Sequence, residues 1–323
     1  MSLIIHSTII IITSILIYYL GEKFAKSSTI LGNYFHLSKS VKGATFDAIA
    51  GSMPELMVAL FSVIFFAKFE VGIGTIAGSA LFNLLIIPGI CVLVSKKVFR
   101  VSKEVLTRDA LFYLISIFIL LVLVIYAKTW GFLVALILIG TYFVYLHKIV
   151  SDSKKYNEHI QRAQHESKSK LIKELVVFFG TMFAMGLATY FLTDAAIKIS
   201  EILSISPIII AFTVIAAATS IPDTVISVYN AKRGRDDDAM SNVFGSNIFD
   251  ILIGLGLPLV IYVATVGTLT IVFEYKEIIF GLLGATIMLF YFMMQDNKLE
   301  KKEGVFLLLL YVFFVVYVVS LAL

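Results

Sequence analysis

Hydrophobic positions in this chain are gathered into long stretches that are nearly free of Asp, Glu, Lys and Arg. A helix of roughly 20 apolar residues is long enough to cross a bilayer core about 30 Å thick. Ten stretches have about that length, and they run near residues 2–21, 43–67, 71–95, 109–127, 129–147, 174–193, 205–230, 239–263, 277–295 and 304–323. The pattern therefore predicts an all-α membrane protein with ten transmembrane helices.

The longest polar stretch lies near the middle of the chain and divides the spans into two groups of five. We interpret residues 151–173 as a cytoplasmic linker without a function of its own. It separates a first five-helix half, 1–150, from a second, 174–323.

Positive charges indicate how the spans are oriented, because cytoplasmic loops retain Lys and Arg. Of the 26 Lys and Arg residues, 22 fall in alternate loops and only Lys68, Lys128, Lys198 and Lys276 lie on the opposite side. This split predicts a multi-pass protein of the cell membrane with both termini extracytoplasmic. The first stretch, Ser2–Gly21, shows no signal-peptide cleavage pattern, and we expect it to remain as a membrane helix.

Composition agrees with this class. The chain has 323 residues, of which 59% are hydrophobic and 15% charged, whereas soluble proteins carry roughly 25% charged residues. This excludes an ordinary soluble enzyme, and the net charge of +4 indicates no nucleic-acid partner. The single cysteine, Cys91, allows no intrachain disulfide and no cysteine-built metal site.

Two blocks of sequence recur in the two halves. Residues 43–55 (GATFDAIAGSMPE) match 211–223 (AFTVIAAATSIPD), so that Ser52, Pro54 and Glu55 recur 168 positions later as Ser220, Pro222 and Asp223. Residues 78–83 (GSALFN) match 245–250 (GSNIFD) at an offset of 167. We infer a duplication, with repeat motifs at 43–95 and 211–263. Because each half has five spans, the second copy must enter the membrane from the opposite side, which is the inverted-repeat plan of secondary transporters.

Three carboxylates, Glu55, Asp223 and Asp250, lie well inside these predicted spans, and no Lys or Arg lies there with them. A charged side chain at mid-membrane costs at least about 2.5 to 3.5 kcal/mol on insertion scales, so each carboxylate needs a partner. Bound cations or protons are the natural partners.

Other polar groups of the repeats fit a site for hard cations. Pro54 and Pro222 lack an amide hydrogen, so each should disturb the preceding turn and free carbonyls there. Ser79 and Ser246 precede Asn83 and Asp250 by four residues, which places each pair on one helix face. Ca²⁺ takes six to eight such oxygen ligands. The adjacent Gly78 and Gly245 we interpret as allowing close helix contact.

At these residues the sequence resembles the sodium/calcium exchangers of the calcium/cation antiporter superfamily, and its motifs are most similar to the potassium-dependent branch. The resemblance is carried by "GATFDAIAGSMPEL" with "VGIGTIAGSALFN" and by "ATSIPDTVISVYNAKRG" with "GSNIFDILIGLGLP". It implies a Na⁺/Ca²⁺ antiporter that works by alternating access, transports Ca²⁺ and Na⁺ with or without K⁺, and needs no other cofactor. We expect it to function as a monomer and not as an enzyme.

The resemblance also implies individual roles. Glu55 and Asp223 would be the central calcium carboxylates, assisted by the carbonyls of Gly51 and Thr219. Asn83 and Asp250 would flank the centre. The sodium sites would use four serines and two carbonyls, namely Ser52, Ser79, Ser220 and Ser246 with Ala48 and Ala216.

Two positions depart from the family's pattern. Gly51 stands where many members have Thr, which removes a hydroxyl but keeps the carbonyl. Asp47 stands where an apolar residue is usual, and we interpret it as a vestibule carboxylate near Lys39 or Lys42, with cation attraction or proton binding as the alternative. Three ionised carboxylates would match three Na⁺ or Ca²⁺ plus K⁺, whereas Ca²⁺ alone would require a proton on Asp250.

Three other functions remain open at this point. A proton/calcium antiporter shares the inverted plan, but its usual Gly-Asn-x-x-Glu motif is absent. An intramembrane aspartyl protease using Asp223 and Asp250 would leave Glu55 and the repeat unexplained. A passive cation channel fits twin broken helices less well than alternating access does.

Overall fold

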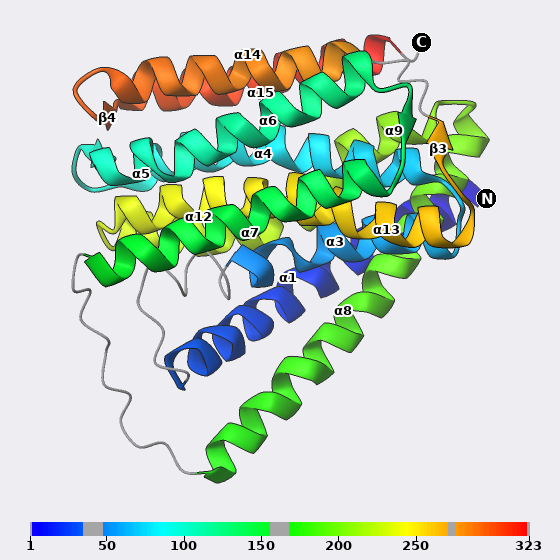
Figure 1. The fold of residues 1–323 in the computed structure, drawn as a ribbon, viewed down its shortest axis with the longest axis horizontal. Coiled ribbons are helices and arrows are strands. Elements are labelled where there is room, and N and C mark those ends of the chain that lie inside the picture. The colour runs from blue at the N-terminus through cyan, green and yellow to red at the C-terminus, as the bar shows by residue number, and fades with distance from the viewer. Residues whose placement is uncertain (1, 35–47, 156–167, 271–275, 322–323) are drawn as a thin grey trace.

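The computed structural model describes residues 2–34, 48–155, 168–270 and 276–321, which form a bundle of helices with short connections (Figure 1). The helices of the first half are α1 (Ser2–Tyr34), α3 (Ala48–Ile64), α4 (Phe69–Val94), α5 (Lys103–Thr107), α6 (Asp109–Tyr126) and α7 (Phe132–Lys155). Those of the second half are α8 (Lys168–Leu203), α9 (Pro207–Ile210), η2 (Ala211–Ile215), α10 (Ala216–Thr219), α11 (Ile221–Lys232), α12 (Asp236–Phe249), η3 (Asp250–Gly254), α13 (Leu255–Thr265), α14 (Lys276–Met294) and α15 (Lys301–Ser320).

Length and composition make most of these helices fit to cross a membrane. Within the described ranges, eight helices are long and apolar enough, and the bent pair Pro207–Thr219 and Ile221–Lys232 makes a ninth. The helix α3 is apolar but shorter, and the span predicted at 43–67 begins among residues outside the described ranges. The prediction of an all-α membrane protein is confirmed.

Helices α1 and α8 both extend beyond the spans predicted for them, 2–21 and 174–193, because they pack along each other past the apolar stretches (Figure 1). The rings of Phe24 and Phe178 stack with centroids 4.5 Å apart. Beyond them, the Ser27 hydroxyl donates to the carbonyl of Glu174 at 2.8 Å. Helix pairing thus continues where the apolar stretches stop.

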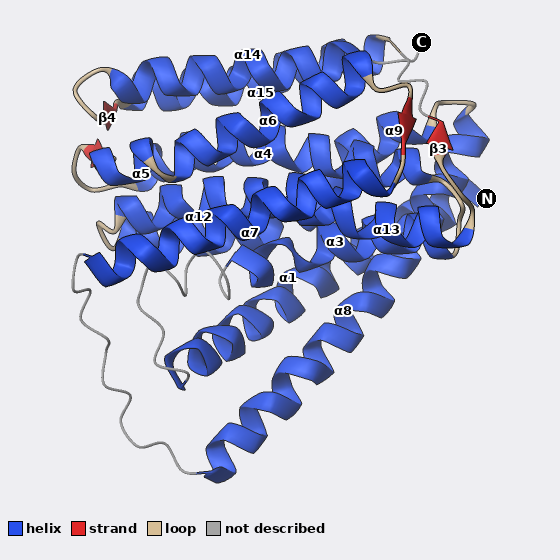
Figure 2. Cartoon of the chain, viewed as in Figure 1, coloured by secondary structure: helices blue, strands red, loops and turns tan. Residues whose placement is uncertain are grey.

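Strands occur in the described chain only as four two-residue segments (Figure 2). Strand β1 (Phe99–Arg100) pairs antiparallel with β4 (Lys298–Leu299), and β2 (Thr129–Trp130) pairs antiparallel with β3 (Leu269–Thr270). Each pair joins a loop of the first half to a loop of the second half.

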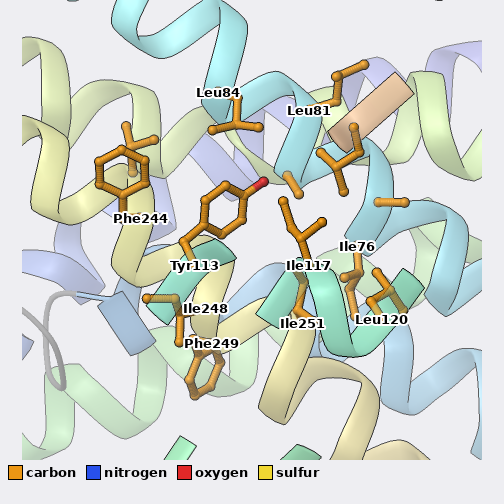
Figure 3. Close-up of a cluster of buried hydrophobic side chains, with 14 of the residues drawn as sticks. Ile76, Leu81, Leu84, Tyr113, Ile117, Leu120, Phe244, Ile248, Phe249 and Ile251 are labelled. Atoms are coloured by element: carbon orange, nitrogen blue, oxygen red, sulfur yellow. The ribbon is translucent and has the colours of Figure 1, made fainter. Parts of the chain in front are cut away.

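The largest hydrophobic cluster lies where α4, α6 and α12 meet (Figure 3). Tyr113 of α6 is fully buried, and its ring faces Phe244 of α12 with centroids 5.9 Å apart. Leu84 of α4 and Ile117 of α6 lie beside it in the same cluster. Close packing of these side chains holds α4 and α12 in a fixed relation.

Both connections between the helices of the repeat motifs contain a residue with left-handed backbone. The turn from α3 to α4 has Ala67 at φ 52°, and the turn from α11 to α12 has Gly234 at φ 68°. Their separation of 167 equals the offset of the second sequence block. The two turns are thus built alike.

Candidate cation site

Two helices each present a row of polar side chains to the interior. A spacing of four residues keeps side chains on one helix face. The rows are Thr75, Ser79 and Asn83 on α4, and Asn242, Ser246 and Asp250 on α12 with the first residue of η3. All six are buried. The pairing of Ser79 with Asn83, and of Ser246 with Asp250, agrees with the spacing in the sequence.

The two prolines act differently on their helices. Pro54 lies inside α3, which runs unbroken from Ala48 to Ile64. Pro222 follows a break at Ser220, whose φ is −78° and ψ is 0°, and the helices on either side are bent by 44°. The expected disturbance is therefore visible as a break at Ser220, in the turn before Pro222, whereas α3 is helical throughout.

Four oxygen contacts connect Glu55 and Asp250 through two serines. Ser79 Oγ lies 3.2 Å from Glu55 Oε1 and 3.2 Å from Asp250 Oδ2. Ser220 Oγ lies 3.3 Å from Glu55 Oε1 and 2.9 Å from Ser79 Oγ. Each hydroxyl has one hydrogen to donate, so two hydrogens serve four contacts. The two contacts without a hydrogen bring the lone pairs of two oxygens together, and a cation between those oxygens would relieve their repulsion.

Asp223 is surrounded by donors. Its Oδ1 accepts from Ser246 Oγ at 2.8 Å and from Asn242 Nδ2 at 3.3 Å, and its Oδ2 accepts from Asn83 Nδ2 at 3.3 Å. Asn83 is held in turn by Asn247, whose Oδ1 accepts from the same Nδ2 at 3.1 Å. This arrangement leaves the Asn83 carbonyl oxygen free to bind a ligand.

Four buried side-chain oxygens around these carboxylates have no hydrogen-bond partner. They are Glu55 Oε2, Asp250 Oδ1, Asn83 Oδ1 and Asn242 Oδ1. A buried acceptor left without a partner costs about 1–3 kcal/mol. No ion pair in the described ranges involves Glu55, Asp223 or Asp250. The site is thus rich in acceptors and contains no protein cation, as a site for metal cations requires.

The carboxylates do not gather into a metal cluster of their own. Among the described residues, no group of three or more His, Cys, Asp or Glu side chains is placed to hold a metal ion. A cation here would need hydroxyl, amide and carbonyl oxygens beside the carboxylates.

The remaining predicted residues surround the same centre, and all are buried. Ser52 Oγ donates to the carbonyl of Ser246 at 3.4 Å. Thr219 Oγ1 bonds back to the carbonyls of Ile215 and Ala216 at 3.1 and 3.2 Å. Ala48 and Ala216 are completely buried. Asp47 lies outside the described residues.

Glycine serves a different purpose at each site position. A Cβ at Gly51 would collide with the Asp223 carboxylate, so the missing side chain gives that carboxylate its space. A Cβ at Gly78 would meet the carbonyl of Phe212, which confirms close helix contact there. At Gly245 a Cβ would lie 3.6 Å from the Cβ of Ala48, an ordinary contact.

Sequence reasoning missed Asn242 and Asn247. Asn242 lies four residues before Ser246, so extending the helical spacing by one turn would have found it. Asn247 directly follows Ser246, and its part in holding Asn83 depends on a contact between helices that no spacing within one helix indicates.

Comparison with known proteins gives a consistent picture. The family model described as sodium/calcium exchanger protein matches residues 6–149 and 173–320. An uncharacterized membrane protein of Methanocaldococcus jannaschii is 27% identical over 92% of this chain and 93% of its own length. The inner membrane protein YrbG of Escherichia coli is 26% identical over 87% of this chain and 89% of its own length.

Two further relatives carry names that state an activity. Sodium/potassium/calcium exchanger 2 of Rattus norvegicus is 35% identical over 48% of this chain, a match that covers 22% of that protein. A structure of the sodium-calcium exchanger NCX_Mj, soaked with 100 mM Na⁺ and 10 mM Sr²⁺, has a TM-score of 0.67 at 23% identity. The match covers 96% of this chain and 97% of that one, so the overall fold is shared.

Proposed function

The chain belongs to the sodium/calcium exchanger protein family, and from this premise we propose that it exchanges Na⁺ for Ca²⁺ across the membrane by alternating access. The observation that carries the proposal is the set of unpartnered buried oxygens beside Glu55 and Asp250. Such acceptors suit hard cations, and the completely buried carboxylates suit a centre that reaches only one side at a time.

We assign ten spans in two inverted halves, 1–150 and 174–323, joined by the linker 151–173. Two features support this assignment. Ala67 and Gly234 give the two repeat motifs equivalent left-handed turns. The strand pairs are also related by the repeat. In chain order, β1 and β2 of the first half correspond to β3 and β4 of the second. Exchanging each strand for its counterpart turns the β1–β4 pair into the β3–β2 pair, and both pairs are present.

Within the site, we assign Glu55 and Asp223 as the central calcium ligands, with the carbonyls of Gly51 and Thr219. Asn83 and Asp250 flank them. The sodium positions use Ser52, Ser79, Ser220 and Ser246 with the carbonyls of Ala48 and Ala216. The shortage of hydrogens around Ser79 and Ser220 supports this division, because monovalent cations between these oxygens would relieve the repulsion of their lone pairs.

The charge of Asp250 determines whether K⁺ accompanies Ca²⁺. If Asp250 is ionised, a second cation balances the site; if it carries a proton, Ca²⁺ alone does. Replacing Asp250 by Asn should therefore retain Ca²⁺ uptake and abolish any stimulation by K⁺.

For the cellular arrangement, we propose a monomer in the cell membrane with both termini extracytoplasmic, on the basis of the 22 to 4 distribution of Lys and Arg. A reporter that works only outside the cytoplasm can be fused to Leu323, and we expect it to be active. A silent reporter would mean that the orientation is the reverse of the one proposed.

The function is tested by Ca²⁺ uptake into proteoliposomes loaded with Na⁺. Controls are Na⁺-free vesicles with and without K⁺ or a pH gradient, together with the Glu55→Gln variant. We expect uptake that requires Na⁺ and is lost in Glu55→Gln. Uptake driven by protons alone would establish the proton/calcium antiporter, and uptake without a counter-ion would establish a channel.

A further inference from the structure

We propose that Asn242 forms an additional Ca²⁺-binding position, one helical turn from the central site on its cytoplasmic side, which the ion occupies as it enters or leaves. This inference rests on the proposed exchange function. Asn242 is only 5% exposed, and its carbonyl oxygen has no hydrogen-bond partner. It belongs neither to the residues that the sequence assigned to the site nor to the hydrophobic cluster.

The orientation of the Asn242 amide is fixed by its neighbours. Ser227 Oγ donates its hydrogen to the carbonyl of Ala239 at 3.2 Å, so toward Asn242 it can only accept. Asn242 Nδ2 donates to that oxygen at 3.1 Å and to the carboxylate of Asp223 at 3.3 Å. With the nitrogen held by two acceptors, the oxygen must face the opposite direction, where it receives no donor.

In the proposed orientation, Asn242 lies on the cytoplasmic side of Ser246. It lies four residues before Ser246, about 6 Å along the axis of α12, in the direction of Asp236. The end of α12 at Asp236 adjoins Lys232, Arg233 and Arg235, the cation-rich loop that the charge distribution places in the cytoplasm. Ca²⁺ moving between Asp223 and that side can therefore exchange one water ligand for the Asn242 oxygen.

The corresponding position in the first half is built differently. Thr75 precedes Asn242 by 167 residues, the offset of this block. Its hydroxyl donates to the carbonyl of Val71 in its own helix at 2.9 Å, so a short hydroxyl held against its own helix stands where the second half has the longer amide of Asn242. The two halves therefore differ at this position, and the effect of replacing the Asn242 amide should be confined to one face of the membrane.

The test compares the KM for Ca²⁺ at the two faces, measured from Na⁺-driven uptake into inside-out and right-side-out membrane vesicles. Asn242→Thr copies the residue of the first half. We expect it to raise the cytoplasmic KM about fivefold, the effect of losing one ligand contact, and to leave the KM at the other face within about twofold. Thr75→Val is the matched variant in the first half and should leave the cytoplasmic KM within about twofold.

The results that would overturn the proposal are distinct. An equal rise at both faces would mean that Asn242 acts only by holding Asp223, and an unchanged cytoplasmic KM would mean that its oxygen binds water. Loss of Na⁺-driven uptake in the unaltered protein would instead refute the proposed exchange function.

Discussion

Gly51 should tolerate no side chain, because the carboxylate of Asp223 occupies the space that a Cβ would take. A Cβ built at this position would lie 2.9 Å from Asp223 Cγ and closer still to Oδ1, whereas contacts shorter than 3.0 Å essentially never occur for real Cβ atoms. Overpacking of this kind costs about 1–3 kcal/mol. In Gly51→Ala the carboxylate must therefore turn away from the position in which Ser246 and Asn83 hold it.

The cost should appear in cation affinity. Without a bound ion, the Asp223 side chain can rotate away from the new methyl group, but with Ca²⁺ bound it must return. The whole penalty then opposes binding, and about 1–3 kcal/mol corresponds to a loss of roughly 5- to 150-fold in affinity. The assay is the KM for Ca²⁺ in Na⁺-driven uptake, together with thermal unfolding in detergent to verify the fold.

Gly245→Ala is the control for this experiment. Gly245 also lies among the site helices, but its new Cβ would be 3.6 Å from the nearest atom, so its affinity should change less than about twofold. If Gly51→Ala bound Ca²⁺ as tightly as Gly245→Ala, the Asp223 carboxylate would not occupy this position in the ion-bound protein, and the reasoning would be refuted.

Three further predictions concern packing, backbone and coupling. Gly281→Ala should lower the melting temperature because its Cβ would collide with the ring of Phe314. Gly284→Ala has nothing within 4 Å of the new Cβ and should raise the free energy of unfolding by about 0.5–1 kcal/mol. Equal shifts in the two variants would contradict the packing of α14 on α15. Ala67→Gly should stabilise the protein by up to about 1 kcal/mol, since Ala67 adopts φ 52°, and a lower melting temperature would contradict this. If three Na⁺ exchange for one Ca²⁺, one net positive charge leaves the vesicle in each cycle, which is worth about 2.3 kcal/mol per 100 mV. An inside-positive potential should then accelerate Ca²⁺ uptake into Na⁺-loaded proteoliposomes. Uptake that does not depend on the potential would exclude that stoichiometry.

The centre of the candidate site could be predicted from the sequence because matching blocks in the two halves mark it twice. Glu55 and Asp223 lie in matching blocks, and a carboxylate among apolar residues needs a partner wherever the helices are placed. The structure brings Ser79 of one half into contact with Ser220 of the other at 2.9 Å, as expected if the matching blocks of both halves face one centre.

What the sequence did not provide depends on contacts between helices. The part of Asn247 becomes visible only when α12 is packed against α4, where its amide also donates to the carbonyl of Ala80 at 3.2 Å. The collision at Gly51 likewise requires the position of Asp223. Hydropathy also gave no sign that α1 and α8 continue past the apolar stretches, since their pairing involves Ser27 and a backbone carbonyl.

The change of offset between the repeats, from 168 to 167, is explained by the turns. Glu55 precedes Ala67 by 12 residues, and Asp223 precedes Gly234 by 11. The second half therefore has one residue fewer between its carboxylate and its left-handed turn. From there to Asn83 and Asp250 the offset stays at 167. A deletion inside α4 or α12 would have rotated the polar row by about 100° away from the site. A residue lost before the turn leaves both rows in register. The halves can then differ in side chains such as Thr75 and Asn242 while the backbone of the candidate cation site is preserved.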